Sequence, residues 1–315
     1  MKRPQIFWGW YIVAAGVTLS AYNSGMFVYG FTAFIGPIAA TYGWSYAQIS
    51  LAISLRGMES GTLNPLLGVV VDRWPSRRLV LIGVIALVAG IMWISQATSL
   101  TMFYIGFLIM GVGSSLGAYM VPQTSIVRWF RKDVGKASGV LAMGMGISGA
   151  FIPLTVRMID AFGWRQTLVI LALGMLAIGT PLSFVFRNRP EDHGLWPDGK
   201  PPSNSADADA GASFELSITT GEALKMRAFW HIGLAAMIQM GAVTIVNTHV
   251  MPYLESIGVD RTTAGHVAMM IPLTSCFSRF PFGWLCDIIT KKYVMALALL
   301  LKCIGLILFW FVGQD

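Results

Sequence analysis

The sequence predicts an all-α polytopic membrane protein, because it is poor in charge and contains long apolar stretches. Of its 315 residues, 55% are hydrophobic and only 12% are charged, whereas a soluble domain carries about 25% charged residues. No charged residue occurs between Pro4 and Leu55. Since a hydrocarbon core of roughly 30 Å is crossed by about 20 apolar residues of helix, this composition favours a chain that passes through a bilayer repeatedly.

Apolar stretches of this length recur and predict nine membrane-spanning helices. We place them near residues 7–31, 46–71, 79–97, 101–126, 137–160, 165–186, 228–254, 262–286 and 293–312. The stretch after the sixth helix is polar and rich in Pro, Ser, Ala and Asp, which is typical of a flexible linker. We therefore divide the chain into an N-terminal six-helix bundle (1–186), a cytoplasmic linker (187–227) and an incomplete C-terminal bundle of three helices (228–315).

Basic residues are distributed unequally between the two sides of these helices. If the N-terminus is cytoplasmic, the inward segments carry sixteen Lys and Arg residues and the outward segments carry three, Arg157, Arg165 and Arg261. The positive-inside rule therefore predicts a multi-pass protein of the cell's inner (plasma) membrane with a cytoplasmic N-terminus. Topology and anionic lipid headgroups account for the formal net charge of +7, so the lipid bilayer is an expected partner and nucleic acid is not.

A short pattern occurs twice, six predicted helices apart. Gly68 is followed four residues later by Asp72, Gly283 is followed in the same way by Asp287, and basic residues come after each Asp. The Gly permits close approach of two helices, and the Asp can pair with a cation or with a helix N-terminus. We expect these loops to act as gates. The predicted gating residues are Gly68, Asp72, Arg73, Arg77, Arg78, Gly283, Asp287, Lys291 and Lys292.

The duplicated loop resembles the signature of the major facilitator superfamily, Gly-x-x-x-Asp-(Arg/Lys)-x-Gly-x-(Arg/Lys)-(Arg/Lys). The resemblance implies the major facilitator fold, in which two six-helix bundles are related by a repeat. About nine of the expected twelve transmembrane helices are present in this chain. We therefore expect either a truncated fragment or a protein that assembles with another chain.

Further motifs resemble a narrower group within that superfamily. The Trp-Gly-Trp at residues 8–10 and the Trp-Phe-x-Lys at residues 129–132 are similar to motifs of the monocarboxylate porters. The segment 247–253 and the spacing from Arg279 to Asp287 are similar to bacterial members and to oxalate–formate antiporters. The resemblance implies that Arg279 binds a substrate carboxylate. Monocarboxylate porters carry an Asp four residues earlier, where this chain has Ser275, so coupling to protons and coupling by exchange both stay open.

Ionisable residues inside predicted membrane helices indicate functional positions, because a charge within the bilayer costs several kcal/mol. Arg56 and Glu59 lie near the middle of the second helix and share one face; they form either an intrahelical ion pair or part of a central cavity. No acid lies one turn from Arg279, which suits capture of a carboxylate. His249 is either a structural residue or a proton-coupling group. Lys302, in the ninth helix, has no explanation from the sequence.

These observations favour a secondary active transporter that moves a small organic anion, a mono- or dicarboxylate, by alternating access. Symport with protons and antiport by exchange are both compatible with the sequence. We predict substrate contacts from Arg279, Arg56, Glu59 and Asn247, and proton coupling through His249 or Glu59. The alternatives are efflux of a drug-like or uncharged solute and a transport-dead receptor or fragment. The spacing of residues predicts no catalytic group, no metal site and no cofactor, and it leaves the oligomeric state open.

Overall fold

The computed structural model describes residues 7–28, 30–199, 220–256, 258 and 261–311. Some side chains within these ranges, including those of 244–256, lie outside the described residues. The chain divides into two compact units, one formed by 1–199 with 275–288 and the other by 200–274 with 289–315. We describe each unit by itself. The predicted bundle boundaries at 186 and 228 stay a prediction.

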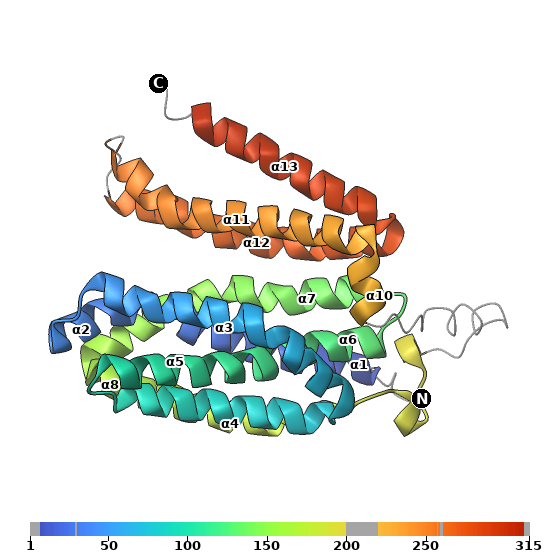
Figure 1. The fold of residues 1–315 in the computed structure, drawn as a ribbon, viewed down its shortest axis with the longest axis horizontal. Helices are drawn as coiled ribbons and strands as arrows, with labels where there is room; N and C mark the ends of the chain where they lie inside the picture. Colours follow the sequence, from blue (N-terminus) through green and yellow to red (C-terminus); the bar gives the residue numbers. More distant parts are fainter. Residues whose placement is uncertain (1–6, 29, 200–219, 257, 259–260, 312–315) are drawn as a thin grey trace, which may run out of the picture. The chain divides into compact units, whose positions relative to one another are not determined.

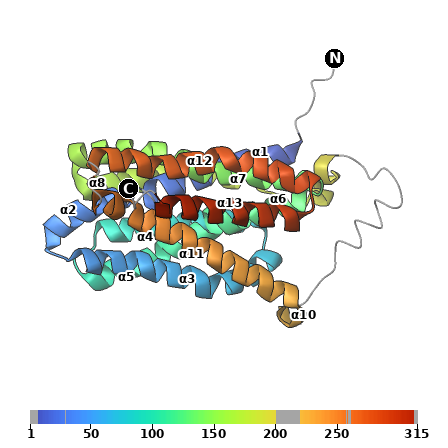
Figure 2. The ribbon, with the colours of Figure 1, turned by 90° about the horizontal axis from the view of Figure 1, so that it is seen from above.

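The first unit is a bundle of long helices that run side by side (Figures 1 and 2). Its helices are α1 (Trp8–Asn23), α2 (Thr32–Tyr42), α3 (Tyr46–Arg73), α4 (Ser76–Ser95), α5 (Leu100–Ser114), α6 (Val121–Trp129), α7 (Val134–Ile147) and α8 (Ile152–Ser183). Two π-helical segments, η1 (Ser24–Val28) and η2 (Ser115–Met120), follow α1 and α5 directly. Short 3₁₀ turns, η3 (Ser148–Phe151), η4 (Glu191–His193) and η5 (Pro197–Gly199), complete the unit.

Local sequence signals account for several helix ends. Ser45 and Gln48 form a capping box at the start of α3, in which the Gln48 amide donates to Ser45 Oγ at 3.2 Å and the Ser45 amide donates to Gln48 Oε1 at 2.8 Å. Gly43 ends α2 in the left-handed region, with φ 68°. Gly163, with φ 78° and ψ 159°, breaks α8 into two helices. This break falls between the fifth and sixth predicted membrane helices, so the sequence located it correctly.

One helix was not predicted. The first predicted helix ends near residue 31, whereas the structure has a separate helix, α2, from Thr32 to Tyr42. Pro37 lies within α2, and proline is unfavourable in helix interiors in water. In an apolar environment the remaining backbone groups still have to be satisfied within a helix, which explains why the helix continues past Gly36 and Pro37.

Helix α4 closely approaches both α5 and the π-helical segment η2 through glycines. A Cβ added to Gly83 would lie 2.4 Å from the Gly117 nitrogen, and one added to Gly90 would lie 2.5 Å from the Met110 nitrogen. Small residues that bring backbones together are the usual means of helix association in membranes. A core of buried apolar side chains, including Phe31, Phe103 and Phe107, fills the bundle beside this contact.

The second unit contains α10 (Thr220–Lys225), α11 (Arg227–Ser256), the first part of α12 (Arg261–Ile288) and α13 (Lys291–Phe311). Within it, the Lys302 ammonium of α13 donates to the carbonyl oxygen of Gln239 in α11 at 3.3 Å. This contact supplies the explanation that the sequence lacked, since a backbone carbonyl is a partner that a lysine can use inside a helix pair.

Three stretches of the described residues are both long enough and apolar enough to cross a membrane. They are Ser76–Ser95, Leu100–Trp129 and Leu154–Ser183, which correspond to the third, fourth and sixth predicted helices. All three belong to the first unit.

Candidate functional site

A cavity of about 520 Å³ opens within the first unit. Its lining consists of Ser20, Arg56, Ser60, Asn64, Ser114, Ser115, Ala118, Tyr119, Met120, Gln123, Thr124, Leu141, Ala142 and Met145. The volume lies in the usual range of roughly 300–1,000 Å³ for small-molecule sites. Hydroxyl and amide groups are frequent in this lining although the surrounding helices are apolar, which indicates a place where a polar molecule can bind.

Of the two alternatives for Arg56 and Glu59, the intrahelical ion pair is not formed among the described residues. Arg56 Nη2 instead donates to Ser114 Oγ on α5 at 3.0 Å. The Glu59 side chain is 8% exposed, and neither of its carboxylate oxygens has a hydrogen-bond partner among the described residues. It packs against Gly111, where an added Cβ would lie 1.9 Å from Glu59 Oε2. Arg56 therefore lines the cavity, whereas Glu59 is buried against α5 and is not among the lining residues.

A buried polar network adjoins Arg56 and was not foreseen from the sequence. Asn23 Nδ2 donates to Ser114 Oγ at 2.9 Å and to the Tyr119 hydroxyl at 3.0 Å. Ser24 Oγ lies 2.7 Å from the same hydroxyl. The network joins η1 to η2, and π-helical turns are frequent at functional sites. The sequence signal for this network is Asn23, a polar residue within an uncharged and largely apolar stretch.

Arg279 lies at the edge of the cavity lining. Its guanidinium donates from Nη1 to the carbonyl oxygen of Ala142 on α7, and Ala142 is one of the lining residues. Arg279 belongs to the 275–288 part of α12, which is part of the first unit. The unit therefore brings Arg279 near the wall of the same cavity that Arg56 lines, although the two lie far apart in the sequence.

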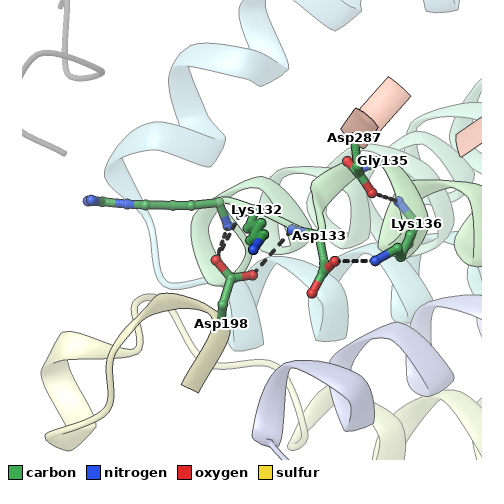
Figure 3. Close-up of polar contacts among 7 residues, drawn as sticks. Lys132, Asp133, Gly135, Lys136, Asp198 and Asp287 are labelled. Carbon is green, nitrogen blue, oxygen red and sulfur yellow. Dashed lines mark hydrogen bonds and ion pairs between the residues drawn. The ribbon is translucent and has the colours of Figure 1, made fainter. Parts of the chain in front are cut away.

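The second copy of the duplicated loop closes tightly on α7. A Cβ added to Gly283 would lie 2.4 Å from the Gly135 carbonyl oxygen and 3.1 Å from the Gly139 Cα. Asp287 Oδ1 accepts from the Gly135 amide at 2.7 Å, and Oδ2 accepts from the Lys136 amide at 2.8 Å (Figure 3). These amides belong to the first turn of α7, where the helix dipole favours a negative charge.

The first copy has different contacts. Asp72 forms an ion pair with Arg128, with Nη2 to Oδ1 at 3.3 Å, and the Asp72 side chain is 77% exposed. A Cβ added to Gly68 would meet no atom within 4 Å. Arg77 stacks over the Phe184 ring at 3.9 Å. The two copies share a sequence pattern but not an environment.

Four further predicted site residues belong to the second unit. Lys292 lies over the Tyr293 ring at 4.8 Å in the second unit, and Lys291 begins α13. Asn247 and His249 belong to α11, but their side chains lie outside the described residues. Their predicted roles stay predictions.

A second carboxylate binds the loop between α6 and α7 from its other side. Asp198 accepts backbone hydrogen bonds from Arg131 at 3.0 Å, Lys132 at 2.8 Å and Asp133 at 3.4 Å (Figure 3). Three successive amides directed at one carboxylate form an anion-binding nest. Asp198 has φ 57°, a backbone conformation that Asp tolerates better than most residues. The segment just after α8 is thereby tied to the loop that precedes α7.

An ion pair within this loop links the two carboxylate contacts. Lys136 Nζ donates to Asp133 Oδ1 at 2.6 Å. The hydrogen bond to Asp133 raises the pKa of the Lys136 ammonium above its usual range, and the charge of Asp287 contributes in the same direction. Lys136 therefore stays protonated at physiological pH, and its ion pair joins the first turn of α7 to Asp133 in the preceding loop.

The helical bundle, its membrane-length apolar helices and its internal cavity define a multi-pass membrane protein of the transporter class. The sequence matches the Major Facilitator Superfamily over residues 13–315, and the chain belongs to this superfamily. The chain is similar in fold to the crystal structure of a bacterial homolog of the human lysosomal transporter Spinster, with a TM-score of 0.61 at 17% sequence identity. The superposition covers 93% of this chain and 64% of that one. The predicted fold class and superfamily are thus confirmed.

Similar proteins include carriers whose names state different substrates. The chain is 25% identical to Monocarboxylate transporter 13 of Bos taurus over 98% of this chain and 68% of the relative. It is 25% identical to the Oxalate:formate antiporter of Oxalobacter formigenes over 95% of this chain and 68% of the relative. A Fujikurins efflux protein of Gibberella fujikuroi is 33% identical over 43% of this chain. The chain spans 57 to 68% of the length of four monocarboxylate transporters to which it is similar.

Proposed function

We propose that this chain is part of a secondary transporter that moves a small organic anion, a mono- or dicarboxylate, by alternating access. The observation that carries the proposal is the cavity of the first unit, which Arg56 lines and whose wall contacts Arg279 through Ala142. Relatives named as monocarboxylate transporters and as an oxalate:formate antiporter support the same substrate class.

Each arginine retains the capacity to bind a carboxylate. A guanidinium has five N–H donors and can hold both oxygens of a carboxylate at once. Within the described residues, Arg56 donates one hydrogen bond, to Ser114, and Arg279 donates one, to Ala142. A carboxylate that enters the cavity would neutralise a positive charge that is otherwise costly inside a membrane protein.

Glu59 is the proposed proton-coupling group among the described residues. Its carboxylate is buried and has no hydrogen-bond partner among the described residues, and it lies one helical turn along α3 from Arg56, which lines the cavity. A buried carboxyl group without a partner is a group that can exchange a proton when its surroundings change. His249 is retained as a second proton-coupling candidate, and Asn247 as a further substrate contact. Exchange of two anions is the alternative mode of coupling.

The duplicated loops are the proposed gates on the cytoplasmic side of the cell's inner (plasma) membrane, with the N-terminus also cytoplasmic. Contacts of Asp287 with the first turn of α7 and of Asp72 with Arg128 support this role. Such contacts can break and re-form between two conformations, which alternating access requires.

The test is uptake of labelled carboxylates by proteoliposomes that contain the purified protein. Arg279→Ala and Arg279→Lys are expected to lower uptake at least about tenfold, because a charge-assisted bidentate contact is worth roughly 1.5–3 kcal/mol. Arg227→Ala serves as the control, since Arg227 is exposed at the start of α11. Equal uptake by the Arg279 variants and the wild type would contradict the proposal.

Efflux of a drug-like or uncharged solute is the second candidate. The Fujikurins efflux protein among the relatives favours it, as do the apolar side chains of Met120, Leu141 and Met145 in the cavity wall. In this case neutral solutes would be exported and the Arg279 variants would retain that activity. A transport-dead receptor would bind its ligand without moving it across the proteoliposome membrane.

A further inference from the structure

The Arg56 guanidinium is connected to a buried asparagine by two successive hydrogen bonds. Arg56 Nη2 donates to Ser114 Oγ at 3.0 Å, and Asn23 Nδ2 donates to the same oxygen at 2.9 Å. Arg56 and Ser114 line the cavity, whereas Asn23 is fully buried and is not among the lining residues. Any influence of Asn23 on a ligand in the cavity therefore passes through the residues that Asn23 contacts.

The Ser114 hydroxyl has an alternative partner on its own helix. A serine or threonine inside a helix often donates to the carbonyl oxygen one turn earlier, as Thr18 and Thr62 do in this unit. Ser114 forms no such bond among the described residues, and both of its hydrogen bonds there are accepted from side chains. The Asn23 amide therefore helps to hold Ser114 in the rotamer in which its oxygen faces Arg56.

The π-helical segment η2 places a second anchor for Asn23 beside Ser114. Asn23 Nδ2 also donates to the Tyr119 hydroxyl at 3.0 Å. Ser114 and Tyr119 are five residues apart, which corresponds to about 140° around the axis of a regular α-helix. In a π-helix the hydrogen bonds run between residues five apart, so residues at this spacing lie near one face. The two N–H groups of one amide can therefore reach both side chains.

The environment of Asn23 favours a functional role over a role in packing alone. Its side-chain oxygen is buried and has no hydrogen-bond partner among the described residues. A buried acceptor without a donor lowers the stability of a fold, and a leucine of similar size would avoid that cost. The amide nitrogen, by contrast, bonds to two residues of the cavity wall. The structure thus keeps a costly amide at the place where it orders that wall.

We propose that Asn23 is a positioning residue for anion binding, which through Ser114 holds the Arg56 guanidinium in place on the cavity wall before a ligand arrives. This inference rests on the proposed anion-transport function and adds to it a residue that does not touch the substrate. An arginine that is already ordered loses less side-chain freedom when a carboxylate binds. Asn23 is therefore expected to tighten anion binding about two- to tenfold.

Isothermal titration calorimetry on the purified chain in detergent tests this inference, with lactate as a monocarboxylate and oxalate as a dicarboxylate. Asn23→Leu removes the amide at similar size and is expected to raise the Kd of the acid that binds about two- to tenfold. Ser114→Ala is expected to raise the Kd at least as much, because it removes the link to Arg56. Asn23→Ala, which is too small to clash, takes the place of Asn23→Leu if the leucine variant does not fold.

The double variant distinguishes positioning from packing. If Asn23 acts through Ser114, Asn23→Leu causes no further loss of affinity in the Ser114→Ala background, so the two effects are non-additive. Tyr22→Phe is the matched control, because this neighbouring residue of α1 donates a hydrogen bond of 2.9 Å to the Leu171 carbonyl oxygen instead. It is expected to lower the thermal stability and to leave the Kd unchanged.

The possible failures are distinguishable. An unchanged Kd in Asn23→Leu or Asn23→Ala, together with a lower Tm, would give Asn23 a purely structural role and overturn the inference without affecting the proposed function. Additive losses in the double variant would show that Asn23 does not act through Ser114, which also overturns the inference. If neither acid binds the wild type, the proposed function is overturned together with the inference.

Discussion

The carboxylate of Asp287 in α12 lies at the N-terminus of α7, where its Oδ1 accepts a hydrogen bond from the Gly135 amide at 2.7 Å. The equivalent residue of the first loop, Asp72, is largely exposed and pairs with Arg128 instead. Two loops with one sequence pattern therefore differ in what they hold together. In this arrangement Asp287 binds the N-terminus of a helix, whereas Asp72 forms an exposed ion pair.

Asp287→Ala is expected to destabilise the protein by about 1 kcal/mol, because it leaves two first-turn amides of α7 without their acceptor. Thermal unfolding in detergent, followed by intrinsic tryptophan fluorescence, measures this change. Asp72→Ala is the paired control and is expected to have a smaller effect, since an exposed ion pair contributes little. Equal shifts in Tm for the two variants would show that the loops are energetically alike.

Gly283→Ala is expected to separate α12 from α7, since the new methyl group would collide with the Gly135 carbonyl. Overpacking of this kind costs about 1–3 kcal/mol. Gly68→Ala, at the equivalent position of the first loop, has open space around the new methyl group and is expected to be neutral or slightly stabilising. Thermal unfolding measures the stability of both variants. A loss of stability in Gly68→Ala alone would contradict the expected difference between the two loops.

Gly111→Ala is expected to displace the Glu59 carboxylate, because the added methyl group would overlap Oε2. If Glu59 couples transport to protons, Gly111→Ala and Glu59→Gln should each reduce proton-driven uptake, and the double variant should be no worse than Glu59→Gln. Such non-additivity is the signature of two residues that act through one interaction. Gly61→Ala, which has no atom within 4 Å of the new methyl group, is the control. Additive losses in the double variant would mean that Gly111 acts independently of Glu59.

Asp198→Ala is expected to free the loop that precedes α7, since three backbone amides would lose their acceptor. Hydrogen–deuterium exchange at Arg131, Lys132 and Asp133 should accelerate at least about tenfold, with little change in the helices of the bundle. Asp192→Ala, in the exposed 3₁₀ turn just upstream, should leave exchange at these amides unchanged. Unaltered exchange in Asp198→Ala would show that other contacts order the loop.

Much of the fold could be predicted because membrane helices have a strong sequence signal. The predicted helix at residues 46–71 corresponds to α3, which ends at Arg73, and the break near residue 163 falls where Gly163 has a positive φ. Apolar length and charge placement are local properties of the sequence, so they suffice to locate helices. The predicted helices leave residues 32–45 without a helix, whereas α2 occupies Thr32–Tyr42 and contains Pro37, a residue type that is unfavourable in helix interiors in water.

The partners of the site residues could not be predicted, because they depend on which helices become neighbours. The i, i+3 spacing allowed Arg56 to pair with Glu59 on the same helix. In the folded unit the guanidinium reaches Ser114 on α5 instead. Likewise, no local pattern connects Asp198 with the loop at Lys132. Uncharged polar residues such as Asn23 were not predicted as site residues, because the prediction relied mainly on charged side chains. The site contains many hydroxyls and amides.

Arg56 is the residue through which the cavity of the first unit is proposed to bind an organic anion. The most direct measurement is calorimetric titration of wild type and Arg56→Gln with lactate and with gluconate, with exposed Arg227→Gln as the control. Loss of the guanidinium should weaken binding of whichever acid binds the wild type at least about tenfold, because hydrogen bonds to charged groups are worth roughly 1.5–3 kcal/mol, while Arg227→Gln binds normally. Wild-type affinity in Arg56→Gln would contradict the proposal that Arg56 binds the anion.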